Sequence, residues 1–232
     1  MNSEKKLARI TGVLYLIIII CAGFSQGFVR SGLIVPGDAA ETAKNIIASE
    51  GLFRIGFVSD IIAFLSDAAV SILLYILLKP VSKTLSLLAA SFRLIAHPAI
   101  ASINMLNHFA ALLLTGGAGY LTVFDTSQLH ALLLFFLEAH HYGYLISGAF
   151  FGVHLVLLGY LLFKSDLFPK LLGILIVLAA VGYLAESFGT FLFPGHEAFF
   201  AWIVILPAAV GELALTLWLL IKGVRTTDTR TA

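Results

Sequence analysis

The feature that most constrains the fold of this chain is an uninterrupted apolar run from Tyr142 to Phe163. The run contains no Asp, Glu, Lys or Arg, and its single histidine is His154. A helix of about 20 apolar residues matches the thickness of the hydrocarbon core of a bilayer, so the run predicts a membrane-spanning helix. Gly148, Gly152 and Gly159 share one face of that helix, where small residues let a neighbouring helix approach closely. We expect that neighbour to belong to the same chain.

The composition is typical of a membrane protein over the whole length. Of the 232 residues, 60% are hydrophobic and 12% are charged, and the mean hydropathy is +1.02. A soluble domain usually carries about 25% charged residues. The net charge of +1 gives no support for a nucleic-acid partner. The single cysteine, Cys21, excludes an intramolecular disulfide and a cysteine-based metal cluster. Because the sequence contains no phosphate-binding glycine loop, H-E-x-x-H or G-x-S-x-G, an enzyme is not favoured.

Further apolar runs predict an all-α fold, a polytopic bundle of about six transmembrane helices that forms one domain over residues 1–232. The predicted spans are 9–29, 53–78, 84–114, 139–163, 168–193 and 199–221. We interpret the first as an uncleaved span, since no small-x-small cleavage site follows it. Asp38 and Glu41 have the spacing of a capping box, which predicts a short helix at about 39–50 on the outer face. Residues 127–138 are also apolar, and the sequence leaves open whether they lie at the interface or extend the fourth span.

The distribution of lysine and arginine predicts the orientation, because short cytoplasmic loops are enriched in both. The residues assigned to one side are Arg30, Lys44 and Arg54. Those assigned to the other side are Lys5, Lys6, Arg9, Lys79, Lys83, Lys164, Lys170, Lys222, Arg225 and Arg230. With Arg93, which lies within a span, these account for all 14 basic residues. We therefore expect both termini on the cytoplasmic side.

Five stretches of the sequence carry a resemblance to a known family. They are ARITGVLYL at 8–16, PGDAAETAKNI at 36–46, LFRIGF at 52–57, FFGVHLVLLGYLLFKS at 150–165 and LFPKLLGIL at 167–175. Together they resemble the bacterial six-pass membrane proteins that share domain of unknown function 4386. The resemblance covers nearly the whole chain and implies a multi-pass protein of the bacterial cytoplasmic (inner) membrane. It implies no activity and no cofactor.

Ionisable residues within the predicted spans are the candidate binding residues. Each costs about 2.5–3.5 kcal/mol at the centre of a membrane helix on insertion scales, so each is expected to face the bundle interior. The predicted buried polar layer comprises Asp60, Asp67, Arg93, His97, His154, Glu186 and Glu212. At 1.5 Å per helical residue, Arg93, His154 and Glu212 lie roughly 15 Å from the cytoplasmic end. The four acidic residues would face only Arg93, and a proton, a cation or water would have to compensate the excess negative charge.

Three functions are compatible with this pattern. In the first, the polar layer binds or translocates a proton, an ion or a small solute without a cofactor. In the second, the histidines bind haem or a metal in a redox or hydrolytic protein. The candidate ligands would be His97, His108, His140 and His154. In the third, the buried charges only fix helix packing in a structural or sensory component. The first best explains the acidic excess. The lipid bilayer is the expected partner, and the oligomeric state stays open.

Overall fold

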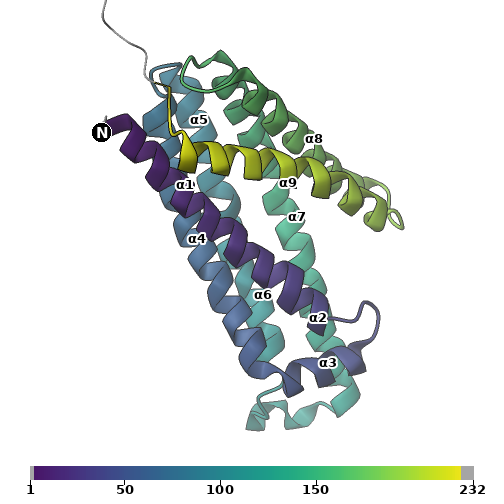
Figure 1. Cartoon of the computed structure of the whole chain (residues 1–232). Helices are drawn as coiled ribbons and strands as arrows, with labels where there is room; N and C mark the ends of the chain where they lie inside the picture. Colours follow the sequence, from purple (N-terminus) through teal and green to yellow (C-terminus); the bar gives the residue numbers. More distant parts are fainter. Residues whose placement is uncertain (1–2, 226–232) are drawn as a thin grey trace, which may run out of the picture.

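The computed structural model describes residues 3–225, and over these residues it consists of helices and their connections (Figure 1). Six of the helices are long and apolar enough to cross a membrane, which confirms the expected all-helical fold with six candidate spans. They are Ser3–Leu33, Glu50–Leu78 (α4), Lys83–Leu113, Thr126–Lys164 (α7), Lys170–Leu192 (α8) and Glu197–Ile221 (α9).

Two of these long helices each contain a wide, π-helical turn. The first consists of α1 (Ser3–Ala22), η1 (Gly23–Arg30) and α2 (Ser31–Leu33). The third consists of α5 (Lys83–Leu94), η2 (Ile95–Ala101) and α6 (Ser102–Leu113). Pro98 lies inside η2. Proline lacks an N–H and its ring collides with the carbonyl one turn earlier, so a regular α-helical turn is disfavoured there.

The continuation of the first helix through η1 changes the predicted environment of Arg30. The sequence placed this residue in an outer loop, beyond a span that ended at residue 29. In the structure Arg30 is helical and only 9% exposed, so that assignment was wrong.

Short helices occupy the connections at the end of the bundle away from the chain termini. Helix α3 (Ala39–Ala48) begins at Asp38, whose carboxylate accepts a hydrogen bond of 2.9 Å from the Glu41 N–H. The capping-box spacing therefore located the start of this helix, which ends two residues before the predicted limit. A short 3₁₀ helix, η3 (Gly119–Val123), precedes α7.

Helix α7 includes the segment that the sequence left open, because residues 127–138 continue directly into the fourth span. Asp125 caps the helix in a capping box with Gln128. Hydrogen bonds from the Ser127 hydroxyl and the Gln128 N–H hold the pKa of Asp125 below its ordinary value of 3.8. Leu133 and Leu137 are buried in one cluster with residues of α3 and α6, which holds this extension against the end of the bundle away from the chain termini.

The long helices form a closed ring in which each packs on its neighbour in sequence and α9 packs on α1. Both ends of the described chain lie together, because the Arg225 N–H donates to the Leu167 carbonyl and Gly223 lies against Lys5. Figure 1 shows the N-terminus and the end of α9 at the same end of the molecule. Arg230, assigned to this side from the sequence, lies outside the described residues.

The glycine stripe of α7 packs on α8. A Cβ built on Gly159 would lie 2.8 Å from the Gly173 carbonyl oxygen, and one on Gly152 would lie 2.7 Å from Leu184 Cγ. At Gly159 the close atoms include backbone, so the helices can approach this closely only without a side chain there, whereas at Gly152 the close atoms belong to the Leu184 side chain. The stripe thus serves a contact within the chain, as expected.

Candidate functional site

Arg93 is the centre of a buried polar cluster. Its side chain is fully buried on α5, and Nη2 donates to Asp67 Oδ1 of α4 at 2.5 Å. Nη1 donates to the Tyr15 hydroxyl of α1 at 3.2 Å and lies 3.1 Å from His154 Nε2 of α7. The guanidinium also lies over the rings of Tyr15 and Phe151, at 4.6 Å and 5.2 Å from their centroids. The cation is therefore enclosed by a carboxylate, a hydroxyl, an imidazole and two aromatic faces.

The hydrogen bonds of His154 define its protonation state. Nδ1 lies 2.9 Å from the carbonyl oxygen of Ala89, which can only accept. Nε2 faces Arg93, which can only donate. The proton must therefore sit on Nδ1, and the ring is a neutral acceptor for the guanidinium.

Tyr15 connects Arg93 to a second carboxylate. Its hydroxyl accepts from Arg93 and donates to Glu212 Oε2 of α9 at 3.1 Å. The other carboxylate oxygen, Oε1, accepts from the Tyr183 hydroxyl of α8 at 2.9 Å. Each of the six long helices thus contributes to one cluster. This central network consists of Tyr15, Asp67, Arg93, His97, His154, Tyr183 and Glu212.

His97 joins the central network through Asp67 and is not fully buried. Its Nδ1 lies 3.3 Å from Asp67 Oδ2, and its side chain is 12% exposed. The ring packs against Phe64, Tyr144 and Phe151. A proton on His97 would add a second ion pair to Asp67.

The charge of the central network does not balance if both carboxylates are ionised and both histidines are neutral. Arg93 then faces Asp67 and Glu212, which leaves one negative charge in a region removed from water. An uncompensated buried charge is costly, so a proton on His97 or on a carboxyl group, or a bound cation, must supply the balance.

Asp60 lies in a separate group nearer α3, where it pairs with Arg30. Arg30 Nη1 lies 2.5 Å from Asp60 Oδ2, and the Ser25 hydroxyl donates to the same oxygen at 2.7 Å. The expectation that Arg93 alone faces the four acidic residues was therefore wrong.

Two of the candidate metal-ligating histidines lie near this pair. The His108 and His140 rings meet edge to face at 5.2 Å between centroids, and His108 packs on Phe53 at 4.2 Å. Asn104 binds the backbone carbonyl of His140 through its amide nitrogen at 2.7 Å. We call this group the outer cluster, and it consists of Arg30, Asp60, Asn104, His108 and His140.

Tyr144 of α7 lies between the two groups. Its ring is 5.8 Å from the His97 ring and 6.3 Å from the His140 ring, measured between centroids. Aromatic and polar side chains therefore connect the central network to the outer cluster without a break.

Glu186 is not part of either group. It lies on α8 one helical turn beyond Tyr183 and is half-buried, with no hydrogen bond or ion pair to another described residue. Of the predicted layer, the structure thus brings together Asp67, Arg93, His97, His154 and Glu212, and separates Asp60 and Glu186.

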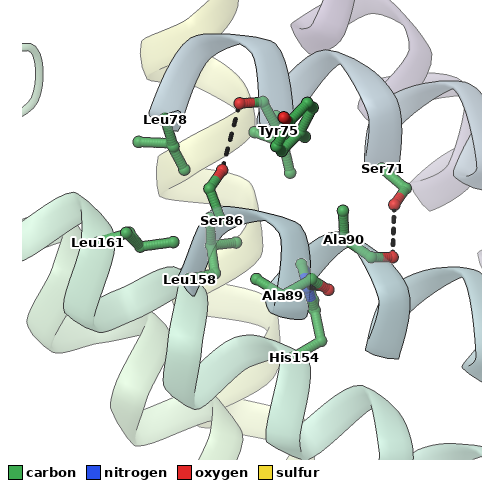
Figure 2. A pocket seen from close by; sticks show the side chains of 10 residues that line it. Ser71, Tyr75, Leu78, Ser86, Ala89, Ala90, His154, Leu158 and Leu161 are labelled. Atoms are coloured by element: carbon green, nitrogen blue, oxygen red, sulfur yellow. Dashed lines mark hydrogen bonds between the residues drawn. The ribbon is translucent and has the colours of Figure 1, made fainter. Parts of the chain in front are cut away.

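A small cavity adjoins His154 on the side of the chain termini (Figure 2). Its volume is about 10 Å³, close to the space of one water molecule. The Ser71 hydroxyl donates to the Ala90 carbonyl and the Ser86 hydroxyl to the Tyr75 carbonyl along its wall. Both hydroxyl oxygens keep lone pairs with which a water molecule can bond.

The family of the chain follows from comparison with known proteins. The profile of the family described as "Domain of unknown function (DUF4386)" matches residues 10–223. The chain belongs to this family. A similar protein, from the archaeon Archaeoglobus fulgidus, carries the description "Uncharacterized protein". It is 32% identical over 162 residues, which cover 65% of this chain and 82% of the relative. No solved structure matches.

The histidine pairs of this DUF4386 chain are closely packed by other side chains. The Phe151 ring contacts both His97 and His154, with centroid separations of 4.6 Å and 5.5 Å. His154 Nε2 already forms a hydrogen bond with Arg93. Within residues 3–225, no group of three or more His, Cys, Asp or Glu residues is placed to hold a metal ion.

Tyr15 and Tyr183 of the central network and Arg30 of the outer cluster were not among the predicted site residues. Tyr15 and Tyr183 carry no formal charge, so the cost of burying a charge did not point to them. Arg30 could have been predicted, because a buried Asp60 needs a cationic partner. Arg30 is a basic residue assigned to the same end of the molecule.

Proposed function

We propose that this protein binds a proton, or a small solute that carries one, at the central network and passes it across the bilayer. The observation that carries the proposal is that one fully buried Arg93 serves two carboxylates from different helices, Asp67 directly and Glu212 through the Tyr15 hydroxyl. The state with one added proton is electrically balanced, so the network is suited to take up and release that proton.

Polar groups on either side of the central network support a path through the molecule. On the side of the termini, the water-sized cavity places Ser71 and Ser86 beside His154. On the other side, Tyr144 lies between His97 and His140. Hydroxyls, imidazoles and carboxyl groups can pass a proton between water molecules in a membrane interior.

The test is proton flux in liposomes that contain the purified protein and an internal pH-sensitive dye. Glu212→Gln removes the second carboxylate but keeps its size and an oxygen that accepts from tyrosine, so the variant should fold. We expect its flux to fall to the level of empty liposomes, whereas Glu197→Gln, at the exposed start of the same helix, should behave as wild type.

A purely structural network predicts a different result. Glu212→Gln would then change the melting temperature of the detergent-purified protein and leave its flux equal to that of Glu197→Gln. That outcome would contradict the transport proposal.

We also infer that both termini face the cytoplasm of a bacterial cell. The positions of the basic residues support this orientation, because the buried Arg30 leaves Lys44 and Arg54 as the basic residues of the outer connections. The opposite end carries the lysines and arginines of both termini and of the loops around Lys79 and Lys164.

A further inference from the structure

A long groove lies on the surface of the molecule between α4 and the third span. Its volume is about 470 Å³, and its walls are residues between 57 and 68 of α4 and between 98 and 109 of the third span. Leu65 and Leu106 of these walls are each 69% exposed, so the groove is open to the surroundings of the protein. Both walls belong to candidate membrane spans, and at this depth the surroundings are lipid.

The walls of the groove are apolar. Among the described residues that line it, only Ser102 has a polar side chain, and its hydroxyl already donates to the His97 carbonyl at 3.2 Å. The groove therefore offers hydrophobic contact and no free hydrogen-bond donor to whatever occupies it. A hydrocarbon chain meets that requirement, and a polar solute does not.

The length of the groove matches one leaflet of a bilayer. The distance from residue 57 to residue 68 along α4 is about 16 Å, at 1.5 Å per helical residue. The hydrocarbon core is about 30 Å thick, so one leaflet contributes about 15 Å. Helix α4 begins at Glu50, which places Phe57 near the α3 end of the bundle. The groove therefore extends from that boundary to the middle of the membrane, as one acyl chain does.

A cationic side chain lies beyond the α3 end of the groove. Arg54 precedes the wall residue Ile61 by two helical turns, so both lie on the same face of α4. Arg54 Nε donates to Glu50 at 2.7 Å, and Nη1 and Nη2 have no partner among the described residues. A guanidinium can hold a phosphate group through two parallel hydrogen bonds. The Arg54 and Glu50 side chains are 55% and 48% exposed, so water screens the negative charge that a phosphate adds.

We propose that this groove and Arg54 form a binding site for one phospholipid of the leaflet on the α3 side. One acyl chain lies in the groove, and the phosphate binds the Arg54 guanidinium. The site is separate from the central network and does not depend on the proposed transport. The bound chain packs on Phe64, whose ring stacks on the His97 ring with centroids 6.1 Å apart.

Native mass spectrometry of delipidated, detergent-purified protein titrated with dioleoyl phosphatidylglycerol tests the phosphate contact. We expect the wild type to bind a first lipid more tightly than later ones. Arg54→Gln should bind the first lipid about fivefold more weakly, the usual contribution of one basic side chain at a membrane surface. Lys44→Gln is the matched control, because Lys44 is an exposed basic residue of α3 that pairs with Glu41 in the same way. It should bind as the wild type does.

A second pair of variants tests the groove. Ala68→Phe places a ring at its inner end and should also weaken binding of the first lipid. Ala209→Phe makes the same change at an exposed position of α9 and should not. In the wild type, phosphatidylglycerol with a diazirine in the middle of one acyl chain should label Ile61, Leu65 or Leu106 on illumination.

The label on the wild type decides the matter if Ala68→Phe fails to fold. Equal binding by Arg54→Gln and Lys44→Gln, or labelling confined to other faces of the bundle, would overturn the proposal. So would a dimer that Ala68→Phe separates and Ala209→Phe retains, because a second copy of the chain would then occupy the groove.

Discussion

The Tyr15 hydroxyl links the two halves of the central network by hydrogen bonds. It accepts a hydrogen bond from Arg93 and donates one to Glu212, so it joins the cation to the carboxylate that does not touch it directly. The Tyr15 side chain is fully buried, and no water can replace the hydroxyl without a rearrangement.

Replacing this hydroxyl should therefore destabilise the protein. Tyr15→Phe leaves an N–H of Arg93 and an oxygen of Glu212 without their partner, and we expect a loss of about 1–3 kcal/mol in the free energy of unfolding. Tyr120→Phe is the matched control, since Tyr120 is 69% exposed. Denaturant titration of both variants in detergent measures the difference, and equal stabilities would show that the hydroxyl contributes nothing.

At this scale the sequence identified charged residues well and neutral ones poorly. Asp67, Arg93, His154 and Glu212 stand out because a charge in a membrane span is costly, and the structure brings all four together. Tyr15 and Tyr183 carry no such cost as residue types, and which tyrosine meets a carboxylate depends on how the helices pack.

At the scale of the elements, the close packing of α7 on α8 depends on glycines, which have no side chain, at the contact. At Gly159 the carbonyl oxygen of Gly173 lies only 2.8 Å from the position that a Cβ would occupy. Backbone atoms cannot move aside as a flexible side chain can, so a methyl group here must push the two helices apart.

Two glycine-to-alanine substitutions should change the free energy of unfolding in opposite directions. Gly159→Ala should lower the free energy of unfolding by about 1–3 kcal/mol through overpacking. Gly51→Ala, in α4 with no atom near its would-be Cβ, should raise it by about 0.5–1 kcal/mol because alanine favours a helix. Thermal unfolding of the two variants beside the wild type checks both signs, and a Gly159→Ala variant as stable as Gly51→Ala would contradict the packing argument.

Element boundaries were predictable where a local signal marks them. The Asp38 cap located α3, whereas the sequence of residues 127–138 is equally compatible with an interfacial segment and with an extension of the fourth span. Its apolar residues Leu133 and Leu137 pack on α3 and α6, and a contact between distant segments cannot be deduced from local composition. The π-helical turn around Arg30 had no local signal, and the end predicted for the first span was therefore too early.

The molecule as a whole is a closed ring whose two ends meet. The contact of α9 with α1 places Gly223 against Lys5, so the chain enters and leaves at the same end of the bundle. An even number of spans requires this arrangement in a bilayer.

Protease protection tests that arrangement together with the proposed orientation. Cleavable tags at the N-terminus and at the C-terminus should both be cut in inverted membrane vesicles and both be protected in intact spheroplasts. A tag inserted between α3 and α4 should show the reverse. A protein with its two terminal tags on opposite sides would contradict the six-span arrangement, and both terminal tags cut in spheroplasts would contradict the orientation.

The wide turn at Pro98 divides the third span. Helix α5 packs on α4 and α7, whereas α6 packs less extensively on α4, and a groove of about 470 Å³ separates them there. The third span therefore consists of two α-helical segments, α5 and α6, connected by η2. His97, which contacts Asp67, lies within η2. The histidine partner of Asp67 is thus carried by the irregular turn of the third span and not by one of its regular α-helical segments.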